Sequence, residues 1–262
     1  VQTALERNRK KYDLQSKQLK GTEKRDKYKV YGELINTYGY NLEPGSKELT
    51  ALNYYTNEEI TIPLDPTQTP GENAQRYFAK YNKQKRTFEA LTELIQETAD
   101  DIQYLESISN ALDIALSEAD LAQIKEELMQ SGYIRRKHTK KKVKLTSKPM
   151  HYISSDGYDM YVGKNNLQNE ELTFSFANGN DWWFHAKGAP GSHVIVKSGG
   201  DELPDRTFEE AGRLAAYYSK NRGADKVEID YIQKKHVKKP NGAKPGFVVY
   251  YTNYSLVIDS DI

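Results

Sequence analysis

The chain has 262 residues and no cysteine, which excludes disulfide scaffolds and thiolate metal sites and fits a reducing compartment. It contains no apolar run of roughly 18 residues, so no membrane span is expected. The net charge of +1 hides an asymmetry: residues 1–130 carry 17 basic and 22 acidic side chains, whereas residues 131–262 carry 21 and 15. This split predicts two modules, the second of which would meet a polyanionic partner.

Residues 2–38 are predicted to form one basic helix that ends before Gly39, because they contain no proline and many good helix formers. Leu5, Tyr12 and Leu19 recur every seven residues and predict a thin coiled-coil seam. Short β-like runs at 49–55 and 60–64, followed by prolines, predict a hairpin.

Residues 73–130 return to a helical pattern that is strongly acidic from residue 87 onward. Steps of three and four between mostly apolar positions from Phe88 to Leu116 predict a heptad seam, and residues 117–120 predict a restart into a third helix. The basic first helix and this acidic helix are expected to pair antiparallel. A coiled-coil spacer explains the region better than a binding groove does.

Residues 131–150 form a junction with eight bases and no acid, of which we single out Arg135, Arg136, Lys140 and Lys141. Such a run is usually a solvated linker, although it is also able to neutralise phosphates.

Strand-like patterns begin at residue 151. They predict strands at 152–153, 160–162, 172–176, 182–185, 193–196, 227–232 and 247–258, with one helix that opens on a capping-box pattern at 207–210. The predicted fold class is therefore α+β: a helical coiled-coil hairpin with a small β-hairpin insertion (1–130), a basic linker (131–150) and a compact domain with a mainly antiparallel sheet (151–262).

The densest cluster of chemically active residues is 181–194. Alternation along a strand places Trp183, His185 and Lys187 on one face, opposite Trp182, Phe184 and Ala186. If the second set fills the core, the first offers a ring, an imidazole and an ammonium to a ligand. The Gly-Pro turn at 188–191 is suited to an anion, and Ser192 and His193 follow it. A core strand with a tight turn explains the same pattern.

Two further segments extend this hypothesis. The amide-rich loop 163–169 holds Lys164, Asn165 and Asn166, which are suited either to reading base edges or to capping a helix. The loop 234–246 holds five lysines beside a Pro/Gly turn: Lys234, Lys235, Lys238, Lys239 and Lys244. Lysines near exposed rings are the usual design for single-stranded nucleic acid.

Catalytic and metal alternatives are weak. Asp181, His185 and His193 match no HExxH or facial-triad spacing, and no Walker A or GxGxxG fingerprint occurs. Ser192 and His193 are adjacent and would point to opposite faces of a strand. We therefore expect no enzyme, no cofactor and no metal site.

Taken together, segments 163–169, 181–187, 191–194 and 238–248 resemble the NFACT-R domain of the NFACT family. Residues 1–130 are similar to the end of the coiled-coil middle region of that family, and the Firmicute fibronectin-binding branch looks closest. The resemblance is not expected to extend to the amino-terminal NFACT-N domain of the family, so its Asp-Arg motif is not carried over to any residue here.

The resemblance implies a cytoplasmic role in ribosome-associated quality control. Family members bind the large ribosomal subunit with an obstructed nascent chain and recruit alanyl-tRNA, so that an alanine tail grows without a template. Their terminal domain is assigned to RNA binding, and we expect the residues singled out above to contact RNA. Alanine tailing is not expected of this region alone. The alternative is a fibronectin-binding adhesin at the cell surface, as described for the family in streptococci.

Overall fold

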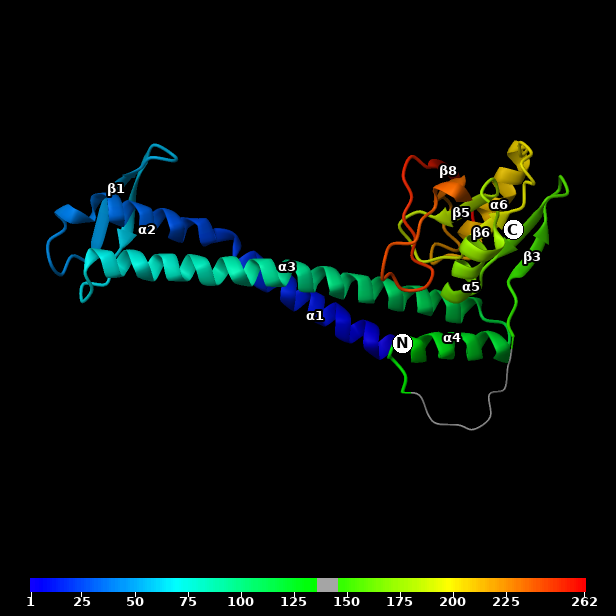
Figure 1. The fold of residues 1–262 in the computed structure, drawn as a ribbon, viewed down its shortest axis with the longest axis horizontal. Helices are drawn as coiled ribbons and strands as arrows, with labels where there is room; N and C mark the ends of the chain where they lie inside the picture. Colours follow the sequence, from blue (N-terminus) through cyan, green and yellow to red (C-terminus); the bar gives the residue numbers. More distant parts are fainter. Residues whose placement is uncertain (136–145) are drawn as a thin grey trace. The chain divides into compact units, whose positions relative to one another are not determined.

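The computed structural model describes residues 1–135 and 146–262, which form two compact units (Figure 1). One unit is Glu6–Asp101; the other combines Val1–Leu5 with Ile102–Ile262. The helices are α1 (Gln2–Gly21), α2 (Asp26–Tyr38), α3 (Pro70–Ile114), α4 (Glu118–Gln130), α5 (Asn166–Glu171) and α6 (Asp205–Tyr217). Shorter helical turns are η1 (Glu23–Arg25), η2 (Gly39–Asn41), the π-helical η3 (Leu172–Phe176) and η4 (Lys234–His236).

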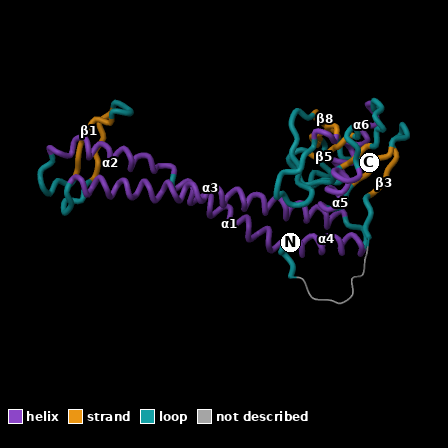
Figure 2. The backbone as a smooth tube through the Cα atoms, viewed as in Figure 1, coloured by secondary structure: helices purple, strands orange, loops and turns teal. Residues whose placement is uncertain are grey.

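The strands make two separate sheets (Figure 2). β1 (Glu48–Asn53) and β2 (Glu58–Pro63) form a hairpin in the first unit, close to its predicted place. The second unit holds an antiparallel sheet in the order β3-β4-β6-β5-β7-β8. Its strands are β3 (Met150–Ile153), β4 (Asp159–Val162), β5 (Trp182–Ala186), β6 (Val194–Val196), β7 (Val227–Gln233) and β8 (Tyr254–Ile258). The predicted α+β class is confirmed.

Within the first unit, the helices pair antiparallel as predicted. Thr98 of α3 donates to Gln15 of α1 at 3.0 Å, and the Arg25 guanidinium lies 4.0 Å from the centre of the Phe88 ring. The seam is more polar than predicted, because Gln15 is buried whereas Tyr12 is 37% exposed.

The prediction of one helix over residues 2–38 is wrong, because α1 stops at Gly21. The Thr22 hydroxyl donates to the Leu19 carbonyl oxygen at 2.6 Å, a local bond that competes with continuation of the helix. A 3₁₀ turn follows before α2 begins.

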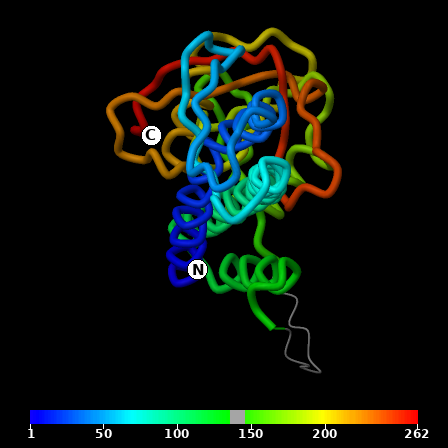
Figure 3. Tube along the Cα trace, turned by 90° about the vertical axis from the view of Figure 1, so that its left-hand side faces the viewer, coloured from blue at the N-terminus to red at the C-terminus, as the bar shows by residue number. Residues whose placement is uncertain are grey.

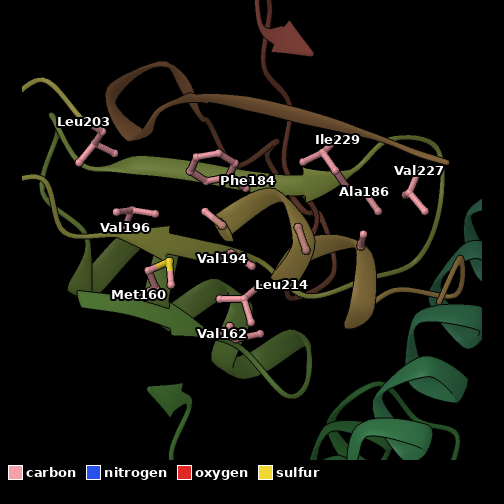
Figure 4. Packing of buried hydrophobic residues seen from close by; sticks show 13 residues of the cluster. Met160, Val162, Phe184, Ala186, Val194, Val196, Leu203, Leu214, Val227 and Ile229 are labelled. Atoms are coloured by element: carbon pink, nitrogen blue, oxygen red, sulfur yellow. The ribbon is translucent and has the colours of Figure 1, made fainter. Parts of the chain in front are cut away.

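Helix α6 covers one face of the six-stranded sheet. Phe184, Val194 and Val196 of the sheet and Leu214 and Ala215 of α6 are at most 4% exposed. Figure 4 shows the side chains of Phe184, Val194 and Leu214 in this core. The predicted capping box at 207–210 is not the start of the helix: α6 begins at Asp205, and the Thr207 hydroxyl donates to Asp156 at 2.8 Å.

The opposite face of the sheet is also covered. Leu172 of η3, Ala177 and Val237 pack against Trp183 and Ile195. The predicted strand at 172–176 is therefore wrong: Asn165 caps α5 through the Gln168 amide, and the chain continues from that helix into η3.

The predicted strand at 247–258 is shorter than expected and covers only 254–258. Upstream, Val249 forms a single bridge with Lys238, and Thr252 has a φ of 56°, which interrupts extended structure. This part of the chain is orange to red in Figure 3, where it runs along the outside of the sheet domain.

The start of α1, the end of α3 and α4 form a second core, in which Leu5, Leu105, Ile108 and Ile124 are almost fully buried. The predicted restart is confirmed, since Ser117 caps α4 through a capping box with Asp120. The predicted seam fails at its end, where Leu116 is 82% exposed, because α3 ends at Ile114 and Leu116 lies beyond the helix.

Buried polar contacts join α4 to the loop before α5. The Lys164 ammonium lies 2.6 Å from the Asp120 carboxylate, and Asn166 donates to Glu127 at 2.9 Å. Burial alone would raise the pKa of Asp120, but hydrogen bonds from Lys164 and Ser147 hold it below its ordinary value. Burial raises the pKa of Glu127 from 4.5 to about 7, and the hydrogen bond from Asn166 only partly opposes that shift.

A prediction for the first unit concerns Gly32 in α2. An added Cβ there would lie 2.8 Å from the end of the Phe78 ring, which must shift, so in urea denaturation Gly32→Ala should have a free energy of unfolding about 1–3 kcal/mol lower than a Gly→Ala change that gains the same helix propensity without a clash. Gly71→Ala is the matched control, because its Cβ meets nothing within 4 Å. Equal stability of the two variants would contradict the described packing.

A second prediction concerns pH. A carboxyl whose pKa is raised by folding stabilises the fold fully below 4.5, and this contribution is lost as pH rises through about 7. The free energy of unfolding should therefore fall by up to about 3 kcal/mol between pH 4.5 and pH 8.5 because of Glu127. Glu127→Gln should remove this part of the pH dependence, whereas exposed Glu118→Gln should leave it unchanged. Parallel pH profiles of Glu127→Gln and the unmodified chain would show that Glu127 does not cause it.

Candidate nucleic-acid interface

The three segments with predicted binding residues meet around one cavity of about 180 Å³. Asn166 and Asn169 come from the amide-rich loop, and His185 and His193 come from the strand segment. The end of the lysine loop and the chain after it contribute Gly246, Phe247, Val248 and Tyr250. Gln103 and Ser107 of α3 complete the lining. The fold thus assembles residues that are up to 147 positions apart in the sequence, from Gln103 to Tyr250.

The two histidines of this cavity are neutral at pH 7. Their rings meet edge to face at 5.4 Å between centroids, and Thr173 hydrogen-bonds to His193 Nδ1 at 2.7 Å. Burial lowers the pKa of His185 to about 4. Burial and the neighbouring His185 also lower the pKa of His193 well below its ordinary value. Neither ring therefore supplies the positive charge expected of a phosphate contact.

The turn at 188–191 keeps part of its predicted capacity for an anion. The amides of Ser192 and His193 are already used, by the Tyr218 carbonyl and the Asn169 side chain. Among the residues that the structure describes, the amides of Gly188, Ala189 and Gly191 donate no hydrogen bond. The Ser192 side chain is 1% exposed and cannot reach a ligand from the surface, which corrects its prediction.

The expected exposed tryptophan is the main correction. Trp183 is fully buried, with Tyr250 at 4.9 Å and His193 at 5.1 Å between ring centroids. The predicted division of the strand is right, since Phe184 and Ala186 lie in the other core. Because both faces of the sheet are covered, the predicted ligand face around Trp183 also forms a core. Of the predicted face only Lys187 is exposed, and it pairs with Glu228.

The amide-rich loop is turned towards the helices. Lys164 pairs with Asp120, Asn165 donates to Gln123 at 2.8 Å, and Asn166 donates to Ser107 and Glu127. A buried amide or ammonium is costly unless it is paired, so these groups stabilise the fold. Their predicted role in reading bases is not supported by their position.

The lysine loop divides into packed and free side chains. Lys239 pairs with Glu170 at 2.7 Å, Lys244 lies 4.5 Å from the Tyr104 ring centre, and Lys234 lies 6.0 Å from that of Phe174. Lys235 and Lys238 are exposed and pair with no acid in the described ranges. They are therefore the lysines of this loop best placed for a phosphate.

Of the predicted linker contacts, Arg135 is exposed, whereas Arg136, Lys140 and Lys141 lie outside the described residues.

An exposed group of rings was missed by the sequence analysis. His151 of β3 and Tyr161 of β4 stack at 4.7 Å, and the 41% exposed Phe176 of η3 meets Tyr161 edge to face at 4.7 Å. We call these three residues the aromatic strip. The Lys197 ammonium lies 4.9 Å from the Phe176 ring centre. In the sequence, the only signal for the aromatic strip is the alternation in the two short strands that hold His151 and Tyr161. Phe176 joins the strip through η3, which was not predicted.

The chain that follows Phe176 contacts the start of the lysine loop. The Lys235 amide donates to the Gly179 carbonyl oxygen at 3.0 Å, which fixes η4 beside the loop that follows Phe176. Rings and ammonium groups on one surface suit an unpaired nucleic-acid strand, because rings stack on bases while lysines neutralise phosphates.

In the described ranges, no helix is both long and apolar enough to cross a membrane.

Comparison with known proteins assigns both parts of the chain to one family. Residues 1–147 match the profile of the NFACT N-terminal and middle domains, and residues 148–251 match that of the NFACT protein RNA binding domain. The chain is 43% identical over 262 residues to the Rqc2 homolog RqcH of Streptococcus pneumoniae serotype 2 (strain D39 / NCTC 7466), covering 100% of this chain and 47% of the relative. It is 40% identical to the protein of the same name from Bacillus subtilis (strain 168), covering 97% of this chain and 45% of the relative.

The chain thus spans about half the length of the curated relatives it matches. A solved structure, that of the C-terminal of the fibronectin/fibrinogen-binding protein from Streptococcus suis, superimposes with a TM-score of 0.77 at 38% identity. This match covers 100% of the chain and 91% of the solved chain. The chain belongs to the NFACT family, and residues 148–251 form its RNA-binding domain.

Proposed function

We propose that this chain is the RNA-binding, carboxy-terminal part of a cytoplasmic ribosome-associated quality control factor. It binds RNA of the large ribosomal subunit or tRNA and supports template-independent alanine tailing of stalled nascent chains. The chain acts by binding, not by catalysis. The relatives named Rqc2 homolog RqcH and the match to an RNA-binding domain support this role.

The observation that carries the proposal is the aromatic strip beside the free lysines. Phe176 is 41% exposed, so an unpaired base is able to stack on it. Lys235 and Lys238 form no ion pair with an acid among the described residues, whereas His151 of the strip contacts Asp159 at 2.7 Å. The RNA therefore binds across the surface of η3 and η4, and the buried Trp183 only supports the layer beneath.

The first test is stacking. Phe176→Ala should weaken binding of fluorescent tRNA by about 1–3 kcal/mol, read by anisotropy at low salt. Tyr251→Ala is the matched control, because this side chain is 73% exposed and lies outside the aromatic strip. An equal loss in both variants, or none in Phe176→Ala, would remove the strip from the interface.

The second test is salt dependence. The logarithm of the affinity for tRNA and for large-subunit RNA should fall linearly with the logarithm of salt concentration. The double change Lys235→Gln and Lys238→Gln should flatten that slope by about one for each phosphate that is no longer neutralised. Exposed Lys226→Gln, at the other end of β7, should leave it unchanged. A flat slope for the unmodified chain would rule out phosphate contacts.

A second candidate function is adhesion. The solved structure with a TM-score of 0.77 belongs to a protein described as fibronectin/fibrinogen-binding. Saturable binding of immobilised fibronectin by nuclease-treated protein would support this role for the chain. Loss of the signal after nuclease treatment would instead assign it to bound nucleic acid.

A further inference from the structure

A second pocket, of about 440 Å³, lies on the α6 face of the sheet, and the proposed RNA contacts do not use it. Its walls are aromatic: Trp182 of β5, Tyr231 of β7, Tyr254 of β8 and Phe208 of α6. Phe208 meets Trp182 edge to face at 4.9 Å, and Tyr231 stacks on Tyr254 at 5.5 Å. We call this cavity the Trp182 pocket.

The walls of this pocket are accessible, unlike those around Trp183. Tyr254 is 59% exposed, and Trp182, Phe208 and Tyr231 are half-buried. Trp182 and Tyr254 stand 6.4 Å apart between ring centroids, which is an ordinary aromatic contact, so a ligand would lie against these rings and not between them. The pocket is a preformed aromatic recess on one side of the sheet.

Three carboxylates line the same pocket: Asp201, Glu202 and Asp205. All three are exposed, and within the ranges 1–135 and 146–262 none forms a salt bridge. Other acids of the domain are neutralised, as Asp181 is by Lys197 and Glu228 by Lys187. Asp205 opens α6, where the helix dipole favours a negative charge, but Asp201 and Glu202 precede the helix and lack this support.

Aromatic faces and uncompensated carboxylates attract the same kind of ligand. Ring faces are negative and bind a cation, and carboxylates accept paired hydrogen bonds from a planar guanidinium. A nucleic-acid phosphate would be repelled, and an uncharged ligand would leave the acids unused. Arginine fits better than lysine because its flat group stacks on a ring while it donates to an acid.

We propose that the Trp182 pocket binds an arginine side chain presented by a protein partner. The guanidinium lies against the rings of Trp182 and Tyr254, and the carboxylates of Asp201 and Glu202 accept its hydrogen bonds. The chain then has two surfaces of opposite charge preference, one for RNA and one for a basic segment of protein. This inference does not depend on the proposed RNA contacts.

The test uses N-acetyl-arginine amide as the probe and N-acetyl-citrulline amide as its uncharged counterpart. Because Trp183 is buried and Trp182 is accessible, a change in tryptophan fluorescence reports occupation of the pocket. The arginine probe should bind the 262-residue chain saturably and at least about fivefold more tightly than the citrulline probe. Equal binding of both probes, or no binding of the arginine probe, would overturn the proposal.

Variants locate the site. The double change Asp201→Asn and Glu202→Gln should weaken the arginine probe at least about fivefold, whereas Asp225→Asn, an exposed acid outside the pocket, should not. Tyr254→Ala should weaken binding of the arginine probe, whereas Tyr251→Ala should not. If the double variant fails to fold, this pair of variants tests whether the probe binds in the Trp182 pocket. Unchanged binding in Tyr254→Ala would overturn the proposal. So would displacement of the arginine probe by tRNA, which would assign the pocket to RNA.

Discussion

The constraint on which the function depends is that both faces of the six-stranded sheet are buried at its centre. Helix α6 covers one face, and η3 with the chain around Val237 and Tyr250 covers the other. A strand with apolar side chains on both faces then has none left for a ligand. The candidate binding surfaces therefore lie where a covering layer ends. One is on β3 and β4 beside Phe176, and the other is the Trp182 pocket.

The same constraint explains why polar residues that look functional are structural. Lys164, Asn165 and Asn166 precede or begin a short helix that packs on α4, so each needs a partner inside the protein. Glu127 makes this contact sensitive to pH, because burial in the folded protein raises the pKa of its carboxyl to about 7. The stability of the helix and sheet contact is accordingly coupled to pH near neutrality.

The sequence predicted most elements but less of the site. Periodicity located the long helices, the restart at Ser117, the β1–β2 hairpin and most strands, because amphipathic patterns record which side faces a core. Alternation separated Trp182 from Trp183 correctly, but it does not reveal whether a second layer covers the other face. That layer includes η3, whose residues favour a strand locally and become helical through the cap at Asn165. The aromatic strip depends on this layer and was therefore missed.

Charge is distributed to match the two surfaces. Lys235 and Lys238 lack acidic partners among the described residues, and acids without salt bridges line the Trp182 pocket. The central claim is that RNA lies across the strip. Photocrosslinking of 4-thiouridine-containing tRNA, followed by mass spectrometry, tests it most directly. The account predicts crosslinks at His151, Tyr161, Phe176 and the 234–238 segment. Crosslinks confined to the Trp182 pocket, or none in the strip, would contradict it.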